Sequence, residues 1–317
     1  MSTRRLAVGV DSSTQSTKVE ARDIDTGDVV ATGSARHPAT EPPVSEQDPR
    51  AWWSALADAL ALLGDHRADV VAMSVAGQQH GLVLLDATGD PVRPAKLWND
   101  TTSAPQSDAL VERLGAATWA DRTGSVPVAA FTVTKLAWVA EHEPEALARV
   151  ARVMLPHDYL TWRLTGAHVT DRGDASGSGW VDTQTGTAAA DLLAAATGDD
   201  GSAWADRVPE ILAPTVAAGA VRPDVAEELG LPPGVVVGPG TGDNMGAALG
   251  LGLRPGDVAI SLGTSGTAFA VSSTPTRDPS GAVAGFSDAT GNYLPLVCTL
   301  NATKVTDTVA RWLGTDA

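Results

Sequence analysis

The segment Gly238–Gly246, which reads Gly-Pro-Gly-Thr-Gly-Asp-Asn-Met-Gly, has the residue types that most favour chemistry. Its glycines allow the backbone to approach another group closely. Asp243 then stands at the start of a helix made mostly of Gly and Ala. A carboxylate at that position can cap the helix, or it can accept a proton from a substrate hydroxyl. The residues alone leave both interpretations open.

A second candidate is the turn Asp11–Lys18, which follows a short apolar run. The amides and hydroxyls of small residues such as Ser13 and Thr14 can surround phosphate oxygens. Asp11 could hold a magnesium ion, and Lys18 could supply a positive charge. The segment has neither Walker spacing nor a GxGxxG pattern, so neither of those folds is indicated. An ordinary polar hairpin is the alternative.

Two further segments carry groups suited to sugar hydroxyls. Gln79 and His80 lie between two β-rich runs and offer directional donors and acceptors. Trp98 places a flat apolar face beside the polar side chain of Asp100. The alternatives are a structural histidine in a loop, and a packed Trp followed by a helix N-cap at Asp100.

The elements around these segments alternate between strand and helix, which predicts an α/β class. A helix begins near Asp48-Pro49 and carries its apolar residues at spacings of three and four. The segment Asp171–Gly179 is expected to be a loop rich in Gly, Ser and Asp. The early strands are expected at Leu6–Val10, Thr17–Ile24, Asp28–Ala35 and Asp69–Val75.

A faint internal repeat links the two halves of the chain. In Ile260–Thr267, as in Val10–Thr17, a strand is succeeded by a turn of small hydroxyl and Gly residues. Thr14 and Thr17 match Thr264 and Thr267 at a constant offset. Chance is one explanation for these two matches. The other is a pair of similar domains, each with one hairpin.

Composition limits the classes of partner. The chain has 317 residues and a net charge of -16, which argues against nucleic acid and anionic membranes. To bind phosphate despite this negative charge, the chain would need local backbone amides, a lysine or a metal ion. Cys298 is the only cysteine, so no intrachain disulfide is expected, and this fits a cytoplasmic location. No apolar run reaches roughly 18 residues, so no membrane span is expected.

Taken in order, these segments resemble the FGGY family of carbohydrate kinases. The resemblance implies an actin-like ATPase (ribonuclease H-like) α/β domain with hairpin phosphate loops, plus the truncated start of a second similar domain. It places the amino-terminal sugar-binding and catalytic domain at 1–245 and the incomplete ATP-binding domain at 246–317. The matching segments are Asp11–Lys18, Gln79-His80, Trp98–Asp100, Asp171–Gly177, Gly242–Asn244 and Ser261–Thr267.

The resemblance implies transfer of the ATP γ-phosphoryl group to a sugar, with Mg²⁺ as cofactor. Asp243 would be the base and Asp11 the metal-holding residue. The sugar contacts would be Gln79, His80, Trp98, Asp100 and Asn244. The phosphate contacts would be Ser13, Thr14, Lys18, Gly263 and Thr264.

Gln79-His80 and Trp98–Asp100 resemble the sugar-binding segments of family members that act on D-xylulose, so the resemblance implies D-xylulose as the sugar. A homodimer is a further expectation. Three alternatives stay open. The first is a family member acting on gluconate, glycerol or ribulose, and the second is a non-catalytic sugar-binding fragment. The third is an actin-like or heat-shock ATPase, although such proteins have no reason to carry the Gln79, His80 and Trp98 set.

The family's second domain continues beyond the point where this sequence ends. We therefore expect the strand Asp257–Leu262 and a helix carrying Val305, Val309 and Trp312 to expose apolar side chains. A chain of these 317 residues is expected to bind sugar, to associate weakly with itself and not to phosphorylate.

Overall fold

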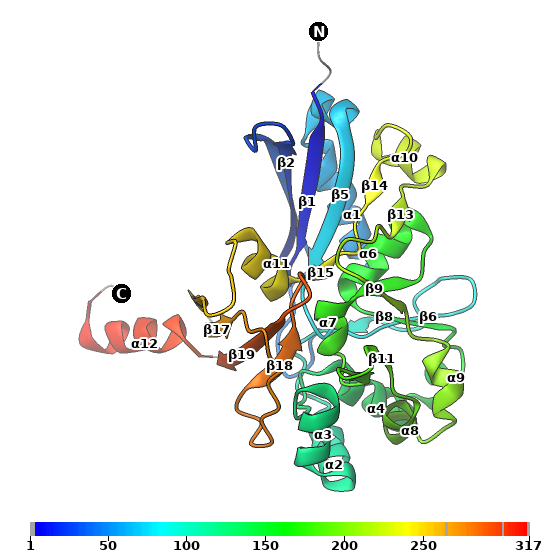
Figure 1. The fold of residues 1–317 in the computed structure, drawn as a ribbon, viewed down its shortest axis with the longest axis vertical. Helices are drawn as coiled ribbons and strands as arrows, with labels where there is room; N and C mark the ends of the chain where they lie inside the picture. The colour runs from blue at the N-terminus through cyan, green and yellow to red at the C-terminus, as the bar shows by residue number, and fades with distance from the viewer. Residues whose placement is uncertain (1–3, 264–265, 300, 316–317) are drawn as a thin grey trace.

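A computed structural model describes residues 4–263, 266–299 and 301–315 of the chain. Its centre is a seven-stranded sheet with the strand order β13-β14-β5-β1-β2-β3, and β15 also pairs with β5 (Figure 1). Strands β1, β2 and β3 are antiparallel neighbours, whereas β1, β14 and β15 run parallel to β5. The strands are β1 (Leu6–Ser12), β2 (Ser16–Asp23), β3 (Val29–Arg36), β5 (Val70–Gly77), β13 (Gly219–Ala220), β14 (Val236–Val237) and β15 (Thr241–Gly242).

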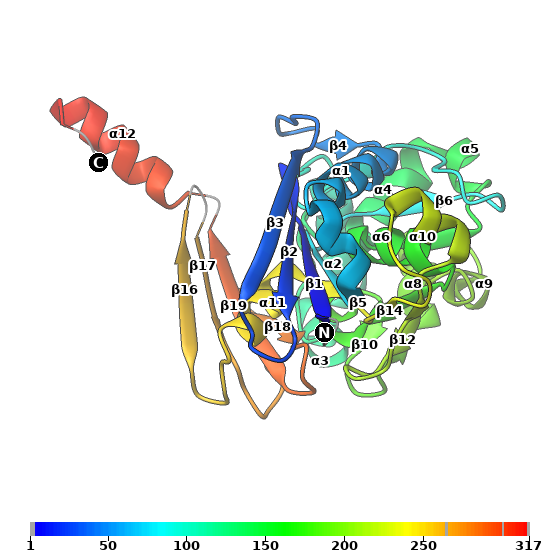
Figure 2. The same cartoon turned by 90° about the horizontal axis from the view of Figure 1, so that it is seen from above.

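Three helices share an apolar core with this sheet, and Figure 2 shows them together beside it. Helix α1 (Pro49–Ala61) begins as expected, because Asp48 accepts a hydrogen bond from the amide of Arg50 and proline occupies the first turn. Its apolar side chains are buried against those of α6 (Pro156–Thr165), α10 (Pro223–Leu229) and the sheet. A 3₁₀ turn, η1 (Gly64–Asp69), leads from α1 into β5.

A second core is mainly helical and lies at the other end of the molecule (Figure 1). It is contributed by α2, α3, α4, α8 and α9, together with the inner residues of a second sheet. The helices of this part are α2 (Ala104–Leu114), α3 (Ala116–Thr123), α4 (Thr132–His142), α5 (Pro144–Leu147), α7 (Arg172–Ser176), α8 (Ala190–Thr197), α9 (Gly201–Ala205) and α11 (Asp243–Gly250).

Short strand pairs tie these helices together. The pairs are β4 (Glu46–Gln47) with β7 (Ala95–Lys96), β6 (Val83–Leu85) with β8 (Arg152–Met154), β9 (Val169–Asp171) with β12 (Glu210–Leu212), and β10 (Val181–Asp182) with β11 (Thr187–Ala188).

The second sheet has the order β16-β17-β19-β18. Its strand β18 packs against α7, where the amide of Ser287 donates to Ser176 Oγ at 2.8 Å. Helix α12 projects away from the rest of the molecule (Figure 2). These elements are β16 (Val258–Leu262), β17 (Gly266–Ala270), β18 (Ala284–Ser287), β19 (Tyr293–Thr299) and α12 (Thr303–Leu313).

The expectation of exposed apolar side chains is confirmed. Val258, Ile260 and Leu262 on β16 are exposed, and so are Val305, Val309, Trp312 and Leu313 on α12. Trp312 has a relative exposure of 80%.

The early strands and the helix after Asp48-Pro49 lie where the sequence predicts them, to within about two residues. The prediction of a loop at Asp171–Gly179 is wrong. Residues of this segment form the end of β9 and the helix α7. Asp171 accepts from the amides of Gly173 and Asp174, so the carboxylate caps a helix start.

In the described part of the chain, no helix is both long enough and apolar enough to span a membrane.

Candidate active site

The end of β5 brings the two candidate catalytic carboxylates to one edge of the sheet. Asp11 of β1 and Thr241 of β15 both pair with Ala76, one from each side. Asp243 follows Thr241 by two residues and begins α11. Parallel strands therefore place Asp11 and Asp243 near each other, although 232 residues separate them in the sequence.

The Asp243 carboxylate is partly buried and keeps a raised affinity for a proton. Burial raises its pKa to about 6, the amide of Asn244 opposes that shift, and the negative charge of Asp11 adds to it. Asp243 Oδ1 accepts from the Asn244 amide at 2.8 Å and from Asn244 Nδ2 at 3.0 Å. A carboxylate with a pKa near the working pH is suited to general-base catalysis.

A pocket of about 560 Å³ opens beside Asp243, between the sheet edge and the second sheet. One side of the pocket is polar and the other is apolar. The polar side is formed by Gln79, His80, Trp98, Asn99, Asp243 and Asn244. The apolar side includes Val126, Val128, Ala129, Ala130, Phe131, Phe286 and Leu296.

Gln79 is connected directly to the candidate base. Its Oε1 accepts from Asn244 Nδ2 at 2.8 Å. Its Nε2 is buried and has no hydrogen-bond partner within the described part of the chain. A buried donor without a partner is costly, so a hydroxyl acceptor bound in the pocket would satisfy it.

His80 is held in a restrained conformation. Its φ is 63°, which makes it the one non-glycine residue with positive φ among the described residues. The imidazole stacks on Phe131 at 4.8 Å, and Nδ1 contacts the carbonyl of Gly177 at 3.0 Å. A carbonyl only accepts, so Nδ1 carries the hydrogen and Nε2 is left as an acceptor. Burial and the charge of Lys135 lower the His80 pKa to about 3, so the ring is neutral.

Trp98 links the pocket to the first hairpin. Its ring lines the pocket, and its Nε1 donates to Thr14 Oγ1 at 2.8 Å. The Thr14 carbonyl is in turn held by Gln47 Nε2 at 3.1 Å. The tip of the hairpin and the pocket wall are therefore parts of one hydrogen-bonded unit.

Asp100 is not among the residues that line this pocket, so the structure does not bring it to the other candidates. Its carboxylate is fully buried and accepts from the amide of Ser45, from Thr102 and from Lys96 Nζ. The alternative prediction of a helix N-cap at Asp100 is wrong, because α2 begins at Ala104 after Ser103.

Some polar groups of the first hairpin form hydrogen bonds within the hairpin itself. The amide and hydroxyl of Ser13 both donate to the carbonyl of Ser16, at 3.0 and 3.1 Å. These donors are engaged within the turn, which argues against Ser13 as a phosphate contact. Lys18 Nζ lies 3.7 Å from Asp11 Oδ2, and both side chains are half exposed.

In the second hairpin, Gly263 follows β16 directly, and its carbonyl accepts from the amide and hydroxyl of Thr303 at 2.9 and 2.8 Å. This carbonyl is therefore engaged with α12, and the role of Gly263 as a phosphate contact stays a prediction. Thr264, the other candidate of this turn, lies outside the described residues.

Asp11 fits a magnesium ion that is held mainly by water and nucleotide phosphates. Burial raises its pKa and the charge of Lys18 opposes that shift, so a cation placed there would favour the ionised form. The described residues contain no group of three or more His, Cys, Asp or Glu side chains arranged for a metal. Magnesium in phosphoryl-transfer sites needs only one or two carboxylates.

Several pocket residues were missed by the sequence analysis. Phe131 and its neighbours form the apolar wall, and Lys135 Nζ donates to the carbonyls of Ala129, Ala130 and Phe131 behind it. Burial lowers the Lys135 pKa to about 7. A lysine between the core residues Val133 and Leu136 was a signal that could have been read.

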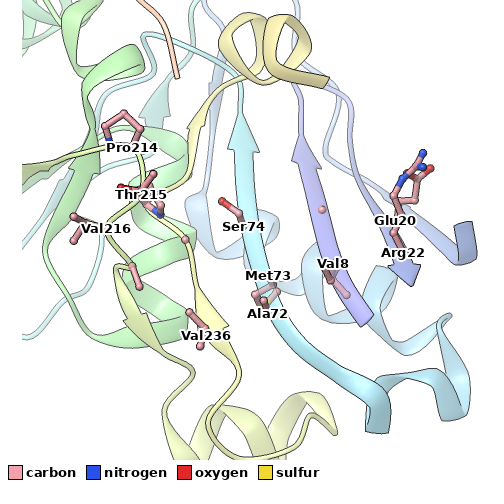
Figure 3. A pocket seen from close by; sticks show the side chains of 15 residues that line it. Val8, Glu20, Arg22, Ala72, Met73, Ser74, Pro214, Thr215, Val216 and Val236 are labelled. Atoms are coloured by element: carbon pink, nitrogen blue, oxygen red, sulfur yellow. The ribbon is translucent and has the colours of Figure 1, made fainter. Parts of the chain in front are cut away.

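A second hollow of about 530 Å³ lies over β1, β2, β5 and β14 (Figure 3). Its lining is mostly small or apolar, and the charged residues Glu20 and Arg22 pair with each other at 2.6 Å. None of the predicted site residues lines it, whereas Gln79, His80, Trp98, Asp243 and Asn244 line the pocket at the strand ends.

The chain is similar to known proteins over almost its whole length. Residues 6–250 match the amino-terminal domain of the FGGY family of carbohydrate kinases. The chain is 54% identical over 314 residues to a xylulose kinase of Streptomyces coelicolor, covering 98% of this chain and 63% of that protein. It is 36% identical over 313 residues to a xylulose kinase of Escherichia coli, covering 97% and 63%. A crystal structure of xylulose kinase from Bifidobacterium adolescentis superposes with a TM-score of 0.90 at 43% identity, covering 99% of this chain and 68% of that one.

The fold is therefore that of the actin-like sugar kinases. The chain belongs to the FGGY family of carbohydrate kinases. It spans 63% of the length of the curated relatives named above.

Proposed function

We propose that the protein acts in the ATP-dependent phosphorylation of D-xylulose to D-xylulose 5-phosphate. The observation that carries the proposal is the Asp243 carboxylate, whose pKa is raised to about 6 where it faces a pocket lined by Gln79 and His80. The relatives named above are xylulose kinases, which favours D-xylulose among the sugars. Membership of a kinase family implies ATP as the phosphoryl donor.

In the proposed mechanism, Asp243 accepts the proton of the terminal sugar hydroxyl. The hydroxyl oxygen then bonds to the γ-phosphorus as the bond between that phosphorus and the ADP oxygen breaks. Gln79 Nε2 donates to one sugar oxygen, and His80 Nε2 accepts from another hydroxyl. Trp98 packs against the sugar, and Asn244 orients both Asp243 and Gln79.

Asp11 would hold the magnesium ion at the end of β1. The ion supplies neutralisation of the phosphate charge. Local positive groups are needed because the chain has a net charge of -16. Lys18 supplies a positive charge 3.7 Å from Asp11, and the turn around Thr14 lies within the same unit as Trp98.

We also propose the division into a sugar-binding and catalytic part, residues 1–245, and the start of an ATP-binding part, residues 246–317. Adenine would bind to residues outside these 317. A homodimer and a cytoplasmic location complete the proposal; light scattering and cell fractionation test them.

The test is Asp243→Asn in the natural full-length chain. We expect turnover to fall roughly 10²–10⁴-fold, because the amide cannot take the proton. Calorimetry should show xylulose affinity within a few-fold of wild type. Asp58→Asn, on the exposed face of α1, is the matched control and should leave both unchanged.

Near-wild-type turnover in Asp243→Asn would remove Asp243 from the mechanism. Faster turnover of gluconate, glycerol or ribulose than of xylulose would replace the proposed substrate. Sugar binding by a full-length chain that releases no ADP would favour a binding protein over a kinase.

A further inference from the structure

A buried histidine lies beneath the candidate site and has no part in the mechanism above. His157 is in the first turn of α6 and is fully buried. Its Nε2 lies 3.2 Å from Asp158 Oδ1, 3.3 Å from Asp171 Oδ1 and 3.5 Å from Asp174 Oδ2. These carboxylates come from three elements, α6, β9 and α7, so one imidazole is shared among them.

Two glycines let this ring approach the loops of the site. A Cβ on Gly240 would lie 2.5 Å from His157 Nδ1, and a Cβ on Gly77 would lie 3.0 Å from His157 Cβ. Gly240 precedes Thr241–Asp243, and Gly77 precedes Gln78–His80. His157 therefore packs between the backbone of Gly240–Asp243, here called the base loop, and that of Gly77–His80, the sugar loop.

A hydrogen bond connects the base loop to the same cluster. Thr241 Oγ1 donates to Asp171 Oδ2 at 2.9 Å. Asp171 also accepts from the amides of Gly173 and Asp174, at 2.7 and 3.1 Å. Displacement of Asp171 would therefore be transmitted to Thr241, two residues before Asp243.

We propose that protonated His157 is a positioning residue that fixes the Asp243 loop by holding Asp158, Asp171 and Asp174 together beneath it. Buried carboxylates repel one another unless a cation lies between them or one of them holds a proton. Burial raises the Asp174 pKa well above its usual range, so a proton on Asp174 relieves part of the repulsion and the His157 cation relieves the rest. The arrangement agrees with the titration of the cluster. Burial disfavours the charged imidazole, but Asp158 and its neighbours outweigh that effect and raise the His157 pKa to about 9. The catalytic consequence of this positioning rests on the proposed function, whereas the positioning itself does not.

Hydrogen–deuterium exchange tests the positioning without sugar or ATP. In His157→Gln, which is neutral, amides in peptides covering residues 238–248 should exchange at least roughly tenfold faster than in wild type. His157→Lys, which keeps the charge, should restore most of the protection. His168→Gln is the matched control, because His168 contacts the carbonyl of Val153 and none of the three carboxylates, and it should leave these peptides unchanged.

Kinetics of the natural full-length chain give the second measurement. His157→Gln should lower kcat roughly 10- to 100-fold through misplacement of Asp243. The affinity for xylulose should change less than kcat, and His157→Lys should recover most of the loss. A residue that only stabilised the fold would lower the amount of active protein without this difference between the Gln and Lys variants.

Unchanged exchange at residues 238–248 in folded His157→Gln would overturn the proposal, whatever the kinase activity. Equal loosening in the Gln and Lys variants would overturn the role of charge. If wild type does not phosphorylate xylulose but the exchange pattern is as expected, the proposed function fails and the positioning role stands. If His157→Gln does not fold, Thr241→Val should increase exchange at 238–248, and no increase there would also refute the proposal.

Discussion

The two hairpins of the molecule, β1–β2 and β16–β17, have similar local structure and opposite surroundings. Both are antiparallel, and both place Gly or hydroxyl residues at the turn. Val10 on β1 is 3% exposed, whereas Ile260, its counterpart in the internal repeat, is 69% exposed. Within these 317 residues, which span 63% of the length of the Streptomyces coelicolor relative, the same kind of segment is thus a core strand in one place and an uncovered edge strand in the other.

The hairpins also differ in register. The last pair of the first hairpin is Ser12 with Thr17, and that of the second is Leu262 with Gly266. The second turn is therefore one residue shorter. Residues at the constant sequence offset occupy matching positions before the turn but not after it. The comparison teaches that strand pairing is a local property, whereas burial depends on what packs over the strand.

The largest effect expected from this contrast is on stability. Val10→Ala should lower the free energy of unfolding by about 2–3 kcal/mol, because it removes buried methyl groups from a packed core. Ile260→Ala should change it by less than about 0.5 kcal/mol in the 317-residue chain, because the side chain is already in water. Urea unfolding of the two variants measures both values. Equal losses would show that β16 is covered in solution, for instance by a second copy.

The next effect concerns charge at the turn. Asp11 has Ser261 at the matching position of the second hairpin, so only the first hairpin presents a carboxylate there. Asp11→Asn should reduce the activity of the full-length chain roughly 10- to 100-fold. Most of this loss should come from a lower affinity for magnesium. Ser261→Ala should cost less than roughly tenfold under the same assay. A magnesium titration that is identical in wild type and Asp11→Asn would contradict the assignment of the metal.

The third effect is a dependence of stability on pH that originates at His157, which lies against Gly77 and Gly240 at the end of the sheet. The His157 pKa is raised to about 9, so its contribution is complete below pH 6.5 and is lost as the pH rises through 9. Burial also raises the pKa of Asp158 to about 6, and that group favours the folded state at still lower pH. Unfolding should therefore become easier by up to about 3 kcal/mol between pH 6.5 and 9.5, since each unit of pKa shift corresponds to about 1.4 kcal/mol.

His157→Gln should flatten that slope. His168→Gln should leave it in place, because burial lowers the His168 pKa and moves its effect below pH 6.5. A wild-type protein whose stability is constant from pH 6.5 to 9.5 would show that the imidazole is neutral.

Much of the fold was accessible from periodicity and turn chemistry. Trp53, Leu56 and Leu60 of α1 and Leu63, which follows the helix, are all buried, as their spacing predicts. The segment Asp171–Gly179 was missed as a helix because Gly, Ser and Asp favour loops. Asp171 overrides that preference by capping the first amides of α7, and this depends on its packing beside His157 and Thr241.

Part of the candidate site could also be predicted from the sequence. Residue type and order singled out Gln79, His80, Trp98 and Asp243, and all four line one pocket. Asp100 has the same chemistry, but the structure points it at the buried Lys96 and at backbone amides. No one-dimensional pattern separates a carboxylate that faces a pocket from one that neutralises a core lysine.

The sequence by itself determined the early strands, the helix after Asp48-Pro49, the glycine-rich turns and the family to which the chain belongs, because these depend on local preferences and on side-chain order. Only the tertiary structure decided that Asp11 and Asp243 meet on either side of β5, and that His157 lies beneath the base loop. Charge interactions depend on distance and on burial. Both quantities are fixed when distant segments pack together, so they cannot be read along the chain.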